Sequence, residues 1–328
     1  MSIILGKIVS IFLITAIGYV ANRKGILPDQ ANTYLVDLLM LITTPCMIVS
    51  SITSTELTED TLLLTIGMLG CAALWFIISA FLAWIVCVKI LRISGKKDAG
   101  IYMALMTSIN NGFMGFPITF ALFGNDCLYL MVMFQTLLMI YLYSGGILQV
   151  NYGLGGPGAT ANPEEEKSKF DLKATLKCLQ NPSTICAAIS IGLLLAGIKL
   201  PEVLFNTVDL VGDSTVPLSM IVVGMRLGSS NLKEVFGNKN LVLTSFIKMI
   251  FWPLLTFLAV NWIPMPVNMK VALVFGATFP SAVAVVPISS MEKRNSVLAA
   301  EGVALTTLLS VVTLPLVAIF LITYYGLA

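Results

Sequence analysis

Ten apolar stretches, each about as long as a membrane-crossing helix, follow one another along this chain. A helix needs about 20 predominantly apolar residues to cross roughly 30 Å of hydrocarbon. Inside a bilayer, only helices and closed barrels satisfy every backbone hydrogen bond. We therefore predict an all-α integral membrane protein with ten transmembrane helices. The predicted spans are residues 3–21, 33–53, 61–91, 99–121, 126–149, 181–198, 205–227, 240–262, 268–289 and 295–325.

The composition supports the membrane class and excludes several functions. The chain is 57% hydrophobic and 11% charged, whereas a soluble domain carries about 25% charged residues. A net charge of +2 gives no reason to expect a nucleic-acid partner. The six cysteines lack metal-ligand spacing and the chain has no histidine, so we expect no metal site. The first apolar run lacks a basic leader and a cleavage site, which favours a retained helix.

The basic residues predict the orientation of the chain. If the ten spans alternate in direction, one side holds 16 of the 19 Lys and Arg residues, and the other holds only Lys7, Lys199 and Lys270. Cytoplasmic loops carry such an excess of positive charge. We therefore expect both termini outside the cell.

A polar segment divides the chain into two halves. Residues 151–161 are rich in glycine, and residues 164–177 mix three glutamates with four lysines. This composition is typical of a flexible linker, and we favour a solvated tether over a regulatory segment. The predicted organisation is a first five-helix unit at 1–150, a cytoplasmic linker at 151–180 and a second five-helix unit at 181–328.

The two halves resemble each other in sequence. Matched residues keep a separation of 168 to 174 positions across five predicted helices, which indicates duplication. Because five is odd, the second copy begins on the opposite side of the membrane and is inverted, as in many secondary transporters. The matched pairs include Pro28 and Pro201, Asn32 and Asn206, Asp37 and Asp209, Pro45 and Pro217, and Pro117 and Pro287.

The fourth and ninth predicted spans are interrupted at corresponding places. The fourth contains Asn110, Asn111 and Gly112 before Pro117, and the ninth contains Pro280-Ser281 before Pro287. Interrupted helices in corresponding positions of two halves indicate a transport site near the middle of the membrane. Each second half-helix would present free N–H groups and partial positive charge, which suits a carboxylate. A small organic anion is thus favoured over a cation.

Ionisable residues inside predicted spans are further candidates, because they are costly in a bilayer. Glu301 either binds a coupling proton or sodium ion or extends to the cytoplasmic interface. Asp37 and Asp209 are coupling candidates too, although a carboxylate in the first turns of a helix also complements the helix dipole. Lys248 either snorkels to the interface or supplies a countercharge for the substrate. Apart from a coupling ion, no cofactor is expected.

Several short motifs, in this order and spacing, resemble the auxin efflux carrier family in its bacterial branch. Asn110 with Gly115-Phe116-Pro117, then Phe134-Gln135-Thr136, and finally Thr306-Thr307-Leu308-Leu309-Ser310 carry the resemblance, which extends from Pro28 to Pro315. It implies two inverted repeats that cross at prolines in helices 4 and 9. It also implies a homodimer in the bacterial cell membrane that moves organic anions by an elevator mechanism.

The resemblance assigns substrate contacts to Asn110, Gln135, Thr136, Pro280 and Ser281. Bacterial members are associated with malate and related carboxylates. This chain departs from plant members in having Ile109 directly before the crossover asparagine and Ile48 where they have a serine. The first break therefore depends more on Gly112, and a polar contact from the second span is in doubt.

Three other functions stay open or are disfavoured. A sodium-coupled symporter of larger amphipathic anions, similar to bile acid transporters, would use the same architecture. A receptor that does not transport is also compatible with the sequence. An intramembrane protease with Asp37 and Asp209 as a dyad is disfavoured, since Val211-Gly212-Asp213 lacks the first glycine of the usual Gly-x-Gly-Asp motif. We therefore expect no enzymatic activity.

Overall fold

The computed structural model describes residues 2–56, 58–93, 98–152, 182–229 and 236–327. Every regular element within these ranges is helical. Most of the predicted linker at 151–180 lies outside the described residues. The helices are α1 (Ser2–Arg23), α2 (Asp29–Leu38), α3 (Thr44–Thr53), α4 (Glu59–Trp84), α5 (Ala99–Thr107), α6 (Phe116–Tyr141), α7 (Ile147–Val150), α9 (Pro182–Leu195), α10 (Glu202–Asp213), α11 (Thr215–Ser229), α13 (Lys239–Phe246), α14 (Trp252–Asn261), α15 (Val267–Thr278), α16 (Val285–Met291) and α17 (Ser296–Tyr325).

Short π-helical turns join several of these helices. They continue the helix without a break, so α2 and α3 form one segment, as do α13 and α14. The turns are η1 (Leu39–Thr43), η2 (Ile85–Ile90), η4 (Asn111–Gly115), η5 (Leu142–Gly146) and η6 (Ile247–Phe251).

Six helical segments in the described part of the chain are long and apolar enough to cross a membrane, and one of them, Ala99–Val150, includes a short non-helical stretch. Large apolar side chains such as Leu63, Ile77 and Val312 are more than half exposed, which in water would be a large unfavourable surface but in lipid is not. The protein is therefore an all-helical integral membrane protein. The six segments are Asp29–Thr53, Asp60–Ile90, Ala99–Val150, Glu202–Ser229, Lys239–Asn261 and Ser296–Tyr325, and Pro182–Leu195 and Val267–Thr278 are shorter apolar helices.

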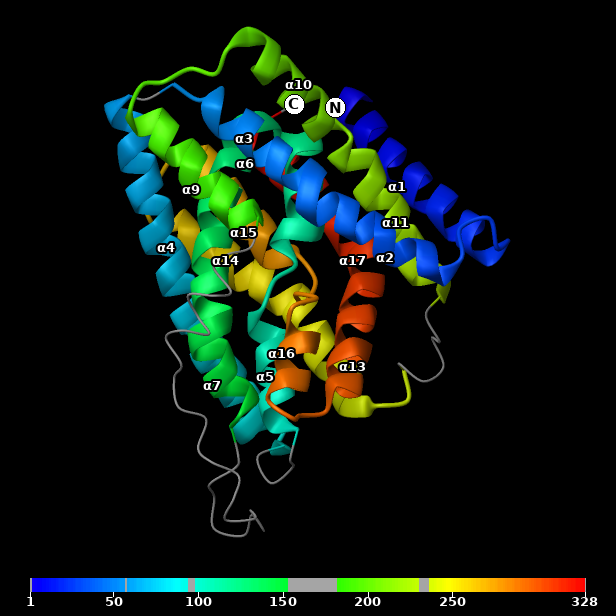
Figure 1. The fold of residues 1–328 in the computed structure, drawn as a ribbon. Helices are drawn as coiled ribbons and strands as arrows, with labels where there is room; N and C mark the ends of the chain where they lie inside the picture. The colour runs from blue at the N-terminus through cyan, green and yellow to red at the C-terminus, as the bar shows by residue number, and fades with distance from the viewer. Residues whose placement is uncertain (1, 57, 94–97, 153–181, 230–235, 328) are drawn as a thin grey trace.

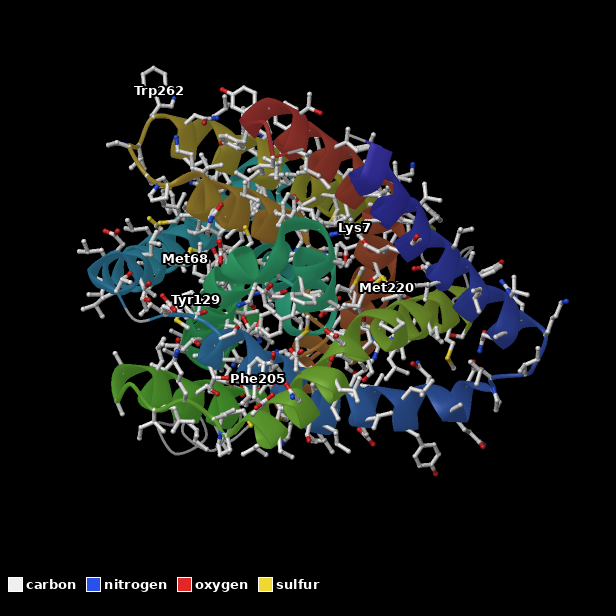
Figure 2. The ribbon with its side chains drawn as sticks, turned by 90° about the horizontal axis from the view of Figure 1, so that it is seen from above. Lys7, Met68, Tyr129, Phe205, Met220 and Trp262 are labelled. Carbon is white, nitrogen blue, oxygen red and sulfur yellow. The ribbon has the colours of Figure 1, made fainter. Side chains whose placement is uncertain are left out.

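A helix from the first half of the sequence packs closely against one from the second half. Helix α1 lies along α11 (Figure 1), and a side chain at Gly18 would collide with the backbone of Ile221, just as one at Gly224 would collide with the backbone of Thr15. Small residues let helix backbones approach in this way when no water is present to drive association. Figure 2 shows the same arrangement from above, with α1 beside the helix that carries Met220.

Two chain breaks cross at the centre of the molecule. Helix α5 ends at Thr107, Ser108 is extended with ψ 148°, and helical structure resumes at Asn111. Helix α15 ends at Thr278, Phe279 is extended with ψ 146°, and α16 begins at Val285. The N–H of Asn110 donates to the carbonyl of Pro280 at 2.7 Å. Both interruptions predicted from the sequence are thus present, and they touch.

Pro117 does not itself make the first break. It follows η4, where helical structure has already resumed at Asn111. In the second break, by contrast, Pro280 follows Phe279, whose extended conformation is the one that a residue before proline prefers. The first break falls earlier, at 108–110, and Gly124 adds a kink within α6 with φ 79°. Ser and Asn side chains compete for backbone hydrogen bonds, which explains why the helix stops at the polar residues.

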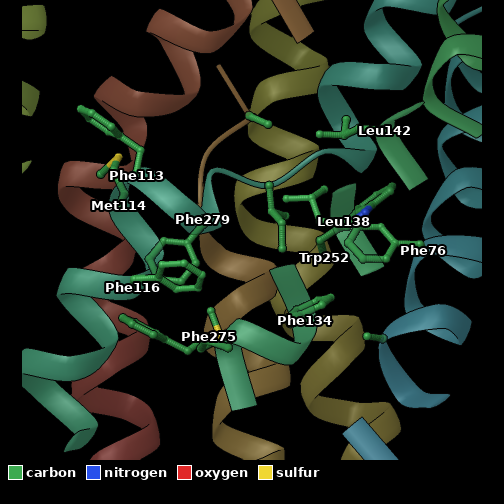
Figure 3. Close-up of a cluster of buried hydrophobic side chains, with 14 of the residues drawn as sticks. Phe76, Phe113, Met114, Phe116, Phe134, Leu138, Leu142, Trp252, Phe275 and Phe279 are labelled. Carbon is green, nitrogen blue, oxygen red and sulfur yellow. The ribbon is translucent and has the colours of Figure 1, made fainter. Parts of the chain in front are cut away.

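An aromatic core holds the crossing in place (Figure 3). Phe275 packs against Phe279 with ring centroids 5.0 Å apart, and Phe134 lies 5.4 Å from Phe76. In Figure 3, Phe116, Phe275 and Phe279 gather on one side of the crossing chains, while Phe76, Phe134 and Trp252 lie on the other. Offset and edge-to-face ring pairs of this kind each add about 0.5–1.5 kcal/mol beyond burial.

Candidate functional site

A cavity of about 170 Å³ lies against the first break. It is enclosed by η4, α6 and the second break on one side, and by α2, α3, α9 and α11 on the other. The predicted residues Asn110, Asn111, Gly112, Gln135 and Thr136 all line it. Five residues chosen from the sequence are thus brought together at one place.

The beginning of η4 gives the cavity a positive character. In a helix that starts at Asn111, the first N–H groups have no carbonyl one turn earlier to bond, and the helix dipole adds partial positive charge there. Gly112 keeps this backbone open, since a Cβ on it would lie 3.4 Å from Nε2 of Gln135. The wall formed by residues 111–113 is therefore suited to hold a carboxylate oxygen.

Three amide side chains of this region keep unused hydrogen-bonding capacity. Asn110 is 6% exposed, and no hydrogen bond occupies its amide within the described part of the chain. Asn111 donates its Nδ2 to the carbonyl of Met131 at 2.9 Å, but its Oδ1 is buried without a partner, as is Oε1 of Gln135. Buried polar groups are normally paired, so unpaired ones beside a cavity indicate a place for a polar ligand.

Thr136 and Gln135 reach the cavity from the same helix but differ in their bonding. The Thr136 hydroxyl donates to the carbonyl of Val132 at 3.1 Å, which leaves its oxygen lone pairs for a ligand. The side-chain oxygen of Gln135 has no hydrogen-bond partner among the described residues. Both positions therefore contribute polar groups to a wall that is otherwise largely apolar.

Arg226 also lines the cavity, and the sequence analysis counted it only as a basic residue near the cytoplasmic side. It lies on α11 with its guanidinium 4.8 Å from the ring centroid of Phe113. An arginine inside a predicted apolar span was the signal that could have singled it out. It places a guanidinium at a cavity that also has a helix N-terminus.

Lys248 is buried at 1% exposure but does not line this cavity. Its Nζ donates to the carbonyl of Leu105 at 3.0 Å and to the carbonyl of Ser108. These carbonyls belong to the end of α5, where a cation satisfies groups that have no intrahelical partner. The geometry gives Lys248 the backbone of the first break as its partner, whereas the sequence suggested a substrate or the interface.

The polar groups of the second break form hydrogen bonds within the crossing itself. Ser281 donates its hydroxyl to the carbonyl of Leu105 at 2.6 Å, and its N–H donates to the hydroxyl of Thr306 at 3.1 Å. Pro280 contributes its carbonyl to Asn110. Pro280, Ser281 and Pro117 do not line the cavity; Ala282, Val283 and Ala284 do.

None of the three carboxylates proposed for coupling is among the described residues that line the cavity. Asp37 is exposed on α2, and Glu301 is half-buried in the second turn of α17. Asp209, on α10, accepts a hydrogen bond from the hydroxyl of Ser50.

These features define a multi-pass membrane protein with a polar cavity at crossing, interrupted helices. A family profile described as membrane transport protein matches residues 3–318. The chain therefore belongs to this family of transporters, the auxin efflux carrier family. It is also similar to an uncharacterized transporter of Methanocaldococcus jannaschii, with 23% identity over 319 residues, covering 93% of this chain and 95% of that protein. The protein is thus a membrane transporter, and its family is one of transporters and not of enzymes.

Proposed function

We propose that this protein is a secondary transporter that carries small organic anions, mono- or dicarboxylates such as malate, by an elevator mechanism. The observation that carries this proposal is the cavity at the first break, where a helix N-terminus, uncommitted amides and Arg226 meet. Among the described residues that line it, there is no aspartate or glutamate. The helix N-terminus and the guanidinium would attract an anion.

The binding mode follows from the donors. One carboxylate oxygen accepts from the N–H groups at Asn111 and Gly112, and the Asn110 amide donates to the other. Arg226 neutralises the charge from the opposite wall, with bonds about twice as strong as those between neutral groups. A dicarboxylate satisfies both ends at once.

The size of the cavity distinguishes the two transporter hypotheses. Pockets for drug-sized ligands measure roughly 300–1,000 Å³, whereas this cavity measures about 170 Å³. A small carboxylate is therefore favoured over a larger amphipathic anion of the bile acid kind.

The proposed architecture is ten spans in two inverted repeats, residues 1–150 and 181–328. The packing supports it: α1 lies against α11 and α9 lies against α3, and exchanging the two halves converts one pair into the other. The cavity lies between the helices of these pairs and the crossing helices. Sliding of the crossing helices along the paired helices would expose the cavity first on one side and then on the other.

The remaining features of the proposal concern topology and assembly. Both termini are outside, as the excess of basic residues on the opposite side indicates, and Figure 1 places the two ends of the chain near each other at the α10 end. By resemblance to the family, the protein forms a homodimer in the plasma membrane.

Uptake of labelled malate, oxalate and indole acetate into proteoliposomes tests the proposal, with sodium and proton gradients imposed separately. We expect malate or oxalate to accumulate and Arg226→Gln to lower apparent affinity by about 10–100-fold, the loss for one charged hydrogen bond. The matched control is Arg23→Gln, because Arg23 also lies over an aromatic ring, that of Tyr19, but is exposed. Uptake of no carboxylate, or equal loss in both variants, would contradict the proposal.

A further inference from the structure

A second, much smaller polar cavity lies where α3, α10 and the kink of α6 meet. Its volume is about 10 Å³, room for a single water-sized particle. The polar residues that line it are Ser50, Ser51, Asn125, Asp209 and Asp213. The proposed carboxylate site does not use this cavity.

Two backbone features bring these side chains together. A Cβ on Gly212 would lie 2.9 Å from Cα of Met47, so the glycine lets α10 approach α3 closely. Gly124 has φ 79°, a left-handed conformation that favours glycine, and it turns the chain so that Asn125 reaches α3. Without either glycine the cavity would not be assembled in this form.

One buried hydroxyl in this cavity lacks a partner. Ser51 is 1% exposed, and no group within the described ranges bonds its Oγ. Asn125 donates Nδ2 to the carbonyl of Ser51 at 3.1 Å and to Oγ of Ser54 at 2.8 Å, which leaves its own oxygen as an acceptor. Asp209 is bonded by Ser50. An unpaired buried hydroxyl is costly, and here it faces a cavity with two carboxylates.

All the polar atoms available in this cavity are oxygens, and oxygen ligands suit hard cations. No group of three His, Cys, Asp or Glu side chains that could hold a metal occurs among the described residues, which disfavours a transition metal or a high-affinity calcium site. We propose that the cavity binds one small monovalent cation, with sodium as the ion of fitting size and hardness.

The corresponding positions in the other half of the sequence lack this chemistry. Asp37 matches Asp209 at a separation of 172 residues, and the same separation takes Ser50 and Ser51 to Val222 and Val223. Asp37 is also exposed. The hydroxyl and carboxylate groups therefore meet in one half only, as expected for a site and not for a feature that duplication merely repeated.

The cation has a defined structural effect. It connects α3 and α10 to the kinked part of α6, and α6 also carries Gln135 of the large cavity. Binding of sodium therefore stabilises one placement of the crossing helices against the paired helices. This inference does not depend on the nature of the transported anion.

Thermal unfolding of the purified full-length protein in detergent tests the site without any carboxylate present. Samples contain NaCl or choline chloride at equal ionic strength. We expect NaCl to raise the unfolding midpoint in a saturable manner, since a ligand that binds only the folded state stabilises it. Asp209→Asn should abolish this shift, and Asp37→Asn, the matched control, should retain it.

The outcomes separate the hypotheses clearly. Equal midpoints in NaCl and choline chloride would show that the cavity holds only water and would overturn the proposal, as would a full sodium shift in Asp209→Asn. If Asp209→Asn does not fold, Ser51→Ala decides: it must raise the sodium concentration at half-effect several-fold, and an unchanged concentration would overturn the site. None of these results bears on carboxylate uptake, so the two proposals fail independently.

Discussion

The two breaks that cross at the centre of the molecule use their polar groups in different ways. At the second break, Ser281 is bonded at both its N–H and its hydroxyl, and the Pro280 carbonyl accepts from Asn110. At the first break, the amides of Asn110 and Asn111 keep unpaired atoms beside the large cavity. The second break thus uses its polar groups within the crossing, whereas the first leaves amide atoms unbonded. The proposed recognition of a ligand therefore falls to the first break.

Substitution of Lys248 should have the largest effect, because this residue stabilises the first break from outside the cavity. Lys248→Ala removes the donor to the Ser108 carbonyl and leaves a void, so we expect a loss of about 2–4 kcal/mol in unfolding free energy. Thermal unfolding in detergent measures it, with the exposed Lys7→Ala as control. A normal midpoint combined with weakened substrate affinity would instead make Lys248 a substrate ligand.

Asn110→Ala tests whether the first break binds the substrate. The side-chain amide has no partner to lose within the described protein, so the unfolding free energy should stay within about 1 kcal/mol of the parent. Apparent substrate affinity should fall roughly 10-fold, the value of one hydrogen bond to a charged group. Uptake kinetics in proteoliposomes provide the measurement. Unchanged affinity would move recognition away from the first break.

Two glycines of η4 differ in how much room a methyl group would have. A methyl group on Gly115 would collide with Oδ1 of Asn111 and lie 3.1 Å from the Phe279 ring, whereas one on Gly112 meets only Gln135 at 3.4 Å. We expect Gly115→Ala to lower the unfolding free energy by about 1–3 kcal/mol, as overpacking does, and to reduce uptake by displacing Asn111. Gly112→Ala should fold normally, and equal stability of the two variants would show that the crossing is looser than the contacts imply.

The smallest effect is expected at the second break. Ser281→Ala removes one hydrogen bond to the Leu105 carbonyl, which Lys248 still satisfies, so stability should fall by about 1 kcal/mol. Substrate affinity should not change, because Ser281 does not line the cavity. A tenfold loss of affinity without loss of stability would restore Ser281 as a substrate contact and erase the division between the breaks.

The sequence pointed to residues that line the large cavity, but not to the distant residues that pack around them. Asn110, Gln135 and Thr136 could be chosen because polar residues in apolar spans are rare and costly, and they lie within 30 residues of one another. The role of Arg226 and the partners of Lys248 could not be chosen in this way. Arg226 is 116 residues away from Asn110, and Lys248 is 143 residues away from its partner Leu105. Such neighbours are defined only when the helices pack.

The long apolar stretches of this sequence determined that the chain is helical and lies in a membrane, because length and hydrophobicity suffice for that. The sequence also indicated where two helices stop, since the amides and Gly112 interrupt one apolar segment and Pro280 interrupts the other. Only the tertiary structure decided which break leaves amide atoms unbonded beside a cavity and which uses its polar groups in the crossing. That choice depends on the contact between Asn110 and Pro280 and on Leu105 and Ser108 meeting Lys248, and contacts between such distant residues are set by packing and not by local preference.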